Sequence, residues 1–180
     1  MRNTVKNFLL ALFLCCSWMV TAQESYTLSA ESVLTISGTS TVHDWEVAAN
    51  SFMGSLTADG DQVNDLKIEV PVVGIKSERG PTMDNKMYAA LKAEAHPSVY
   101  FSMKGVTDPN AMHGMLTIAG VEKEVEIVVN MLQEEGKMSV SGAQDLRLQD
   151  FGMEPPTAMF GQIVVGASVT VSFDLAFVRN

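Results

Sequence analysis

Hydrophobic and polar residues alternate with a period of two over most of the chain after residue 25. The pattern is clearest over residues 169–177, where Val, Val, Phe, Leu and Phe alternate with Thr, Ser, Asp and Ala, and it recurs over 66–72, 99–103 and 125–131. Shorter examples are the pairs Tyr26 and Leu28, Leu34 and Ile36, Leu116 and Ile118, Met138 and Val140, and Leu146 and Leu148. Because successive side chains of a strand point to opposite sides, the alternation predicts strands with one buried face and one wet face. Such strands are typical of antiparallel sheets and disfavour a parallel α/β fold.

One stretch, residues 82–95, departs from this alternation and is rich in Ala, Lys, Met, Leu and Glu. Its apolar residues recur at helical spacing, at Met83, Met87 and Leu91. Thr82 is the expected N-cap, and the helix is expected to end before Pro97, since the residue preceding a proline is driven out of the α conformation. About eight to ten short strands and this one amphipathic helix predict a single all-β domain that is either a closed barrel or a sandwich.

The N-terminus has the features of a secretory signal peptide. Two basic residues precede an apolar run over residues 8–20, and small residues follow it up to Ala22. A membrane anchor and a lipoprotein site are the alternatives, but the run is shorter than the roughly 20 residues of a spanning helix, and the cysteines lack the small residues that usually precede a lipidated cysteine. We expect residues 1–22 to be a cleaved signal peptide, residues 23–180 to be the mature domain, and the location to be periplasmic or secreted.

Removal of this segment changes the composition in two ways. Both cysteines of the chain leave with it, so the mature domain has no disulfide and its stability must come from the core. The mature domain then has 10 basic and 21 acidic residues, a net charge of −11. This charge argues against a nucleic-acid partner, because phosphate contacts need clustered Lys and Arg, and it should repel anionic membrane surfaces. Net charge does not constrain an internal cavity.

The sequence contains none of the common motifs for phosphate loops, paired-cysteine metal sites, zinc proteases or serine hydrolases. The mature domain has three histidines, His43, His96 and His113, and nothing in their spacing argues for a zinc site. His43 precedes Asp44, but neighbouring residues of a strand point to opposite faces, so the two do not predict a dyad. A backbone bond at a strand edge is the first interpretation of His43, a contact with a ligand headgroup the second, and catalysis the third. We expect no catalytic residue, no metal site and no cofactor.

Ten methionines lie after residue 22, together with several phenylalanines. Methionine is a flexible filler that adapts to irregular apolar space. Each one is most simply explained as part of an ordinary core, whereas the group as a whole would also suit an apolar cavity.

Short segments of the chain resemble, in order, those of the YceI-like family, which is also described as polyisoprenoid-binding or lipocalin-like proteins of the bacterial periplasm. The resemblance runs from about residue 26 to the C-terminus, which is nearly the whole mature domain. The matching segments are GTSTVHDW (38–45), FMGSL (52–56), VPVVGI (70–75), MDNKM (83–87), HPSVYF (96–101), GMLTIAG (114–120), DFGM (150–153) and VVG (164–166). One departure is Tyr88-Ala89-Ala90-Leu91, where many members have more aromatic residues, and the form VHDW is typical of a subset.

This resemblance implies an eight-stranded antiparallel lipocalin-like barrel with the helix at about 82–95 inserted between strands. It further implies a long-chain isoprenoid or similar amphiphilic lipid in an apolar tunnel, and an eight-stranded barrel is about wide enough for one slim ligand. A prenyl chain offers no hydrogen-bonding groups along its length, so only its headgroup needs polar partners. The residues expected to line the cavity are Trp45, Phe52, Met87, Leu91, Phe101, Phe151, Met153 and Phe173, and those expected at its mouth are His43 and Asp84.

The sequence leaves three classes of function open. The favoured one is a non-catalytic carrier or store of a lipid such as a prenyl quinone or a fatty-acid derivative. The second is an envelope stress or interaction protein whose barrel is filled by its own side chains, and the third is an enzyme acting on a lipid or small molecule, which would need a buried polar cluster with perturbed titration. As partners we expect a long-chain lipid and no nucleic acid. The sequence leaves open whether the protein contacts a membrane or a membrane protein transiently, and whether it forms a homodimer.

Overall fold

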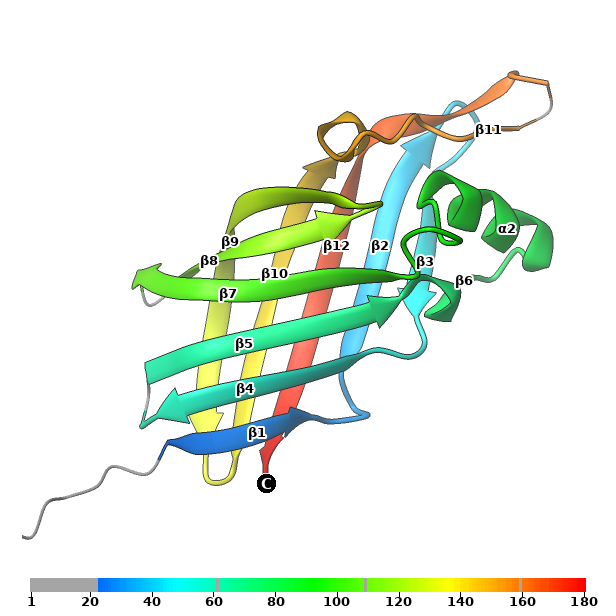
Figure 1. Cartoon of the computed structure of the whole chain (residues 1–180). Coiled ribbons are helices and arrows are strands. Elements are labelled where there is room, and N and C mark those ends of the chain that lie inside the picture. The colour runs from blue at the N-terminus through cyan, green and yellow to red at the C-terminus, as the bar shows by residue number, and fades with distance from the viewer. Residues whose placement is uncertain (1–22, 61, 109, 159) are drawn as a thin grey trace, which may run out of the picture.

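The computed structural model describes residues 23–60, 62–108, 110–158 and 160–180, so the predicted signal peptide lies outside the described residues. These residues form twelve strands, one α-helix and two 3₁₀ helices (Figure 1). The strands are β1 (Glu24–Leu28), β2 (Val33–Ser40), β3 (Trp45–Ala49), β4 (Met53–Asp59), β5 (Gln62–Pro71), β6 (Ile75–Ser77), β7 (Ser98–Asp108), β8 (Ala111–Ile118), β9 (Val121–Glu134), β10 (Lys137–Arg147), β11 (Thr157–Ala158) and β12 (Ile163–Arg179). The helices are η1 (Val72–Gly74), α2 (Pro81–Ala90) and η2 (Leu148–Phe151).

Eight of the described strands form a closed ring in the order β1-β4-β5-β7-β8-β9-β10-β12. The ring closes where residues 177–179 of β12 pair with residues 26–28 of β1. Every pairing around the ring is antiparallel. The predicted eight-stranded antiparallel barrel is therefore confirmed, and the sandwich alternative is wrong.

On one side the barrel wall continues beyond this ring. Short breaks separate β2 from β1, which precedes it in the chain, β3 from β4, which follows it, and β6 from β5, which precedes it. β12 pairs with β1 near its end and with β2 over residues 165–174, while β3 pairs with both β2 and β6. Backbone groups at the breaks keep their partners: the Ser32 hydroxyl accepts the Ala176 N–H at 3.0 Å, and the Asn50 N–H donates to Gly74 O at 2.9 Å. The barrel thus has a taller wall at the end that carries α2 (Figure 1).

The single short helix predicted at about 82–95 is confirmed, but it ends earlier than predicted, and the predicted N-cap, Thr82, is wrong. The helix runs from Pro81 to Ala90, and Gly80 is the N-cap. Proline fits the first helical position, because a backbone N–H at that position would have no partner within the helix. Gly80 leads the chain into the helix with a φ of 85°, which glycine adopts readily. The helix ends early because Lys92 adopts a left-handed φ of 54° and the Ala93 N–H turns back to Tyr88 O at 2.9 Å.

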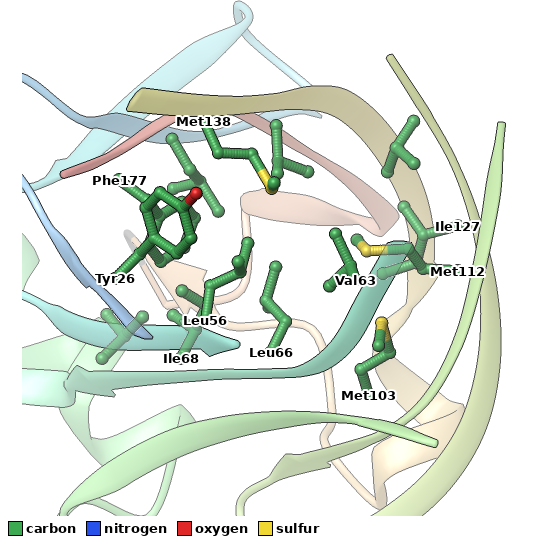
Figure 2. Packing of buried hydrophobic residues seen from close by; sticks show 14 of the residues in the cluster. Tyr26, Leu56, Val63, Leu66, Ile68, Met103, Met112, Ile127, Met138 and Phe177 are labelled. Carbon is green, nitrogen blue, oxygen red and sulfur yellow. The ribbon is translucent and has the colours of Figure 1, made fainter. Parts of the chain in front are cut away.

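The interior is densely packed at the end of the barrel opposite β11. Figure 2 shows buried side chains from β1, β4, β10 and β12 meeting there. We call this group the closed end; it comprises Tyr26, Leu56, Met138, Val140 and Phe177, all at most 2% exposed. Met103, Met112 and Met138 are buried, as the core interpretation of the methionines predicted. With no cysteine after residue 22, this packing is a main source of stability.

We expect Phe177→Ala to lower the free energy of unfolding by about 3–5 kcal/mol, because the lost ring leaves a cavity among side chains that cannot collapse onto it. Val128→Ala is the matched control, since Val128 lies on the outer face of β9 and is 68% exposed; it should cost less than about 1 kcal/mol. Urea unfolding followed by circular dichroism measures both. Equal losses would contradict the assignment of the closed end as the stabilising core.

Candidate ligand-binding cavity

The half of the barrel nearer α2 is hollow. It contains a cavity of about 390 Å³, within the range of about 300–1,000 Å³ found for small-molecule sites. Inward-pointing side chains here are only half buried, because they border the cavity instead of other side chains. Among them are Leu34, Ile36, Val99, Phe101, Leu116, Val171 and Phe173.

The floor of the cavity adjoins the closed end, and its walls are almost entirely apolar. Leu66, Met112, Ile127 and Leu175 line the floor and belong at the same time to the buried core. Aliphatic side chains from β2, β5, β7, β8, β10 and β12 form the walls. A chain of methylene or prenyl units would be desolvated along its whole length here, which favours binding by about 0.8 kcal/mol per buried CH₂.

The helix α2 lies over one side of the cavity and contributes Met83, Lys86, Met87 and Ala90 to its lining. Polar contacts hold the helix on β6. The buried Asp84 carboxylate accepts the Ser77 N–H at 2.9 Å, and the Tyr88 hydroxyl donates to Ile75 O at 3.0 Å.

Lys76 reinforces this attachment from the outer side of β6. Its Nζ donates to the Tyr88 hydroxyl at 2.7 Å and lies 3.7 Å from Asp84 Oδ2. The hydrogen bond with Tyr88 is the main cause that raises the pKa of Lys76 above its usual value, with a smaller contribution from Asp84. The ammonium group is therefore charged over the whole neutral range.

Three aromatic rings of the lining lie flat against glycines of neighbouring strands. The pairs are Trp45 on Gly38, Phe101 on Gly114 and Phe173 on Gly142. At each of these glycines a Cβ would fall less than 3.0 Å from a ring atom. The glycines thus let the rings lie along the wall, where larger residues would push them across the cavity. The indole Nε1–H of Trp45 donates to Thr39 O at 2.9 Å, so the polar group of that ring has a hydrogen-bond partner.

Polar side chains gather where the β2–β3 loop, the β6–α2 loop, α2 and the segment before β11 meet. We call this rim the mouth; the polar residues lining it are Ser40, His43, Glu46, Ser77, Arg79, Lys86, Glu154 and Thr157. Arg79 Nη1 donates to His43 Nε2 at 2.5 Å, and His43 Nδ1 lies 2.9 Å from Asp44 O. Arg79 Nη2 also lies 3.4 Å from His43 Nδ1, so the guanidinium group and the Asp44 backbone together hold the imidazole ring at the mouth.

Seven of the ten residues predicted for the site line the cavity. They are His43, Trp45, Met87, Leu91, Phe101, Met153 and Phe173. Their contact with a ligand stays a prediction, but the structure brings them together around one space.

The other three lie elsewhere. Phe52 is half buried against the core beside the break between β3 and β4, where the alternation restarts. Phe151 is buried in a separate cluster under η2, because a 3₁₀ turn replaces the strand there. Asp84, predicted for the mouth, binds the backbone of Ser77, since a buried carboxylate needs donors.

The sequence reasoning missed the aliphatic walls and the charged part of the mouth. Alternation already placed Leu34, Ile36 and Val171 on inward faces, so the walls could have been found by weighting aliphatic residues as heavily as aromatic ones. No pattern indicated Arg79, which comes from an irregular loop between β6 and α2.

Residues 21–177 match the model of the YceI-like domain. The chain belongs to the YceI-like domain family. This confirms the resemblance drawn from the short segments. No protein with curated annotation matches the sequence significantly.

Several solved structures share the YceI-like fold of this chain. BcnA of Burkholderia cenocepacia has a TM-score of 0.67 at 19% identity, covering 82% of this chain and 96% of its own. A polyisoprenoid binding domain from Saccharophagus degradans, implicated in plant cell wall breakdown, has a TM-score of 0.73 at 10% identity, covering 88% of this chain and all of its own. The YceI protein of Campylobacter jejuni has a TM-score of 0.59 at 19% identity, covering 74% and 84%. At these identities the structures support the fold.

Two further findings concern only the described part of the YceI-like chain. None of its helices is long and apolar enough to cross a membrane. In the same residues, no group of three or more His, Cys, Asp and Glu side chains is placed to hold a metal ion.

We expect Gly38→Ala to weaken binding of an apolar ligand, because the three atoms nearest to the added methyl group all belong to the Trp45 ring, which the methyl group would drive from the wall. Overpacking by one methyl costs about 1–3 kcal/mol, so binding of a prenol such as farnesol should weaken about five-fold or more. Gly105→Ala in β7 is the matched control, since nothing lies within 4 Å of its Cβ position. Isothermal titration calorimetry measures both affinities. Unchanged affinity in Gly38→Ala would show that the ring position does not limit the cavity.

Proposed function

We propose that this chain is an exported protein that holds one long-chain amphiphilic lipid, such as an isoprenoid, a prenyl quinone or a fatty-acid derivative, in its barrel. Its role is that of a carrier or store, without catalysis. The observation that carries the proposal is the division of the barrel into a packed closed end and a hollow, apolar half with a polar mouth.

The chemistry of the cavity matches that of such a ligand. An apolar tail occupies the walled part between β2, β7, β8 and β12, and the headgroup lies at the mouth. There Arg79 and Lys86 offer hydrogen-bond donors. The similarity in fold to a domain described as polyisoprenoid binding supports this class of ligand.

The structure favours this proposal over the two alternatives. A barrel filled by its own side chains, as an interaction protein would have, does not agree with a cavity of about 390 Å³. An enzyme would need perturbed titratable groups inside the cavity. Among the described residues, the two groups with clearly shifted pKa values, Tyr26 and Lys76, lie at the closed end and on the outside of β6.

The proposed location, periplasmic or secreted, rests on the signal-like sequence of residues 1–22. The mature domain would then begin near residue 23 and comprise the whole barrel.

Native mass spectrometry tests the proposal. The chain is expressed from residue 1 in a bacterium that exports it, purified without detergent, and measured under native and denaturing conditions. We expect an extra mass of one lipid per protein under native conditions, which organic solvent extracts and fragmentation identifies. A bare protein mass that stays unchanged after incubation with prenyl quinones and fatty acids would contradict lipid binding.

A cavity-filling variant locates the ligand within the molecule. Val171→Phe adds volume to the wall of the cavity, and we expect the fraction of protein carrying lipid to fall at least several-fold while the fold is kept. Val128→Phe is the control with the same change on the outer face of β9, and its lipid content should equal that of the unmodified protein. Equal lipid content in both variants would place the ligand outside the cavity.

A further inference from the structure

An apolar hairpin tip projects beyond the hollow end of the barrel. The hairpin joins β11 to β12, and Phe160 at its tip is fully exposed. Phe160 also adopts a left-handed φ of 56°, which is uncommon for a bulky residue. In Figure 1 this hairpin reaches past α2 and past the loop between β2 and β3. A fully exposed aromatic ring on a protruding tip is placed to contact another surface.

Two valines lie beside the hairpin and extend its apolar surface. Val42, in the β2–β3 loop, is 62% exposed, and Val164, in β12, is 39% exposed. The two segments are bonded together, since the Thr41 N–H donates to Val164 O at 3.0 Å and the Val164 N–H to Thr41 Oγ1 at 3.3 Å. We call Val42, Phe160 and Val164 the apolar rim.

The apolar rim is continuous with the mouth of the cavity. The residues next to Val42 and Val164 in the sequence, His43, Ile163 and Val165, line the cavity itself. A surface that receives the rim would therefore lie against the opening through which a ligand passes.

The charged groups of the mouth leave donors available to that surface. Arg79 donates to His43 Nε2, and Lys86 donates to Thr157 O at 3.4 Å. Glu46 and Glu154 also line the mouth, but within the described residues neither forms an ion pair with Arg79 or Lys86. Both cations can thus bind phosphate oxygens without first breaking an ion pair.

We propose that the apolar rim docks the mouth on a phospholipid surface, with Phe160 inserted among the acyl chains and Arg79 and Lys86 at the depth of the lipid phosphates. A protruding tip can bury its side chains in a fluid bilayer, which yields around it. The docked mouth would let a water-insoluble lipid pass between bilayer and cavity without crossing water. This transfer of lipid between bilayer and cavity rests on the proposed function, whereas the docking itself does not.

The mode of docking follows from the charges. The described residues carry an excess of acidic groups, so attraction to an anionic surface cannot drive the contact, and burial of apolar side chains must. Binding should therefore occur on vesicles of phosphatidylcholine alone, should not increase when phosphatidylglycerol is added, and should change little between 50 mM and 500 mM salt.

Vesicle flotation with the exported protein tests the proposal. Phe160→Asp removes the aromatic ring, and aspartate tolerates the left-handed backbone; we expect its partition onto phosphatidylcholine vesicles to fall at least ten-fold. Val42→Asp should lower partition by a smaller factor. Val128→Asp, at a valine that is 68% exposed on the outer face of β9, is the control and should stay within two-fold of the unmodified protein.

Each other result counts against the docking. Binding only to anionic vesicles and its loss in salt would show an electrostatic contact instead of insertion. A dimer that Phe160→Asp converts to monomer, with no vesicle binding, would show that the rim joins two copies of the chain. Native mass spectra of the same samples separate this proposal from the proposed function: retained lipid without vesicle binding overturns the docking alone, whereas vesicle binding by a protein that never holds lipid overturns the carrier.

Discussion

Closure of the barrel between β1 and β12 is the constraint on which the rest of the structure depends. The two strands share three residue pairs, so side chains must complete the join. The Tyr26 hydroxyl donates to Glu24 Oε2, and Glu24 forms an ion pair with Arg179 at 3.1 Å. The hydrogen bond to Glu24 is the main cause that raises the pKa of Tyr26, so the hydroxyl keeps its proton at neutral pH. Phe177 is buried at the same join. An unpaired edge here would be free to bind other strands, and closure of the ring removes that edge.

The hollow half keeps its shape because its wall does not depend on contacts across the interior. The strands are held by their backbone ladders, and the rings of Trp45, Phe101 and Phe173 are held by glycines on the strands beside them. The helix α2 is fixed by polar contacts to β6, in which Asp84 is the buried acceptor. A ligand can therefore enter or leave without repacking the core. The free energy gained by burying an apolar ligand is then not offset by the cost of reorganising the protein.

Alternation along the sequence predicted which side chains point inward, but it could not predict which of them border the cavity. Phe173 and Phe177 lie on the same strand, point the same way and belong to one unbroken pattern. Phe177 is buried because β1 brings Tyr26 to it, whereas Phe173 lies against Gly142 and lines the cavity. The difference between the surroundings of Phe177 and Phe173 is determined by strands distant in sequence, so it cannot be predicted from the local sequence pattern. The contact of Asp84 with Ser77 and the position of Arg79 depend instead on the loop between β6 and α2, whose irregular backbone has no periodic pattern to read.

The division of the barrel also separates stability from binding. Of the two clusters of buried side chains in the described residues, the larger includes the closed end, and residues 23–180 contain no cysteine to add a disulfide. Side chains that border the cavity make fewer contacts with one another, so exchanging them changes the ligand site at a smaller cost in stability than changes at the closed end. The solved structures compared above share 10–19% of their residues with this chain at TM-scores of 0.59–0.73, so the fold tolerates wide divergence of the residues that build it.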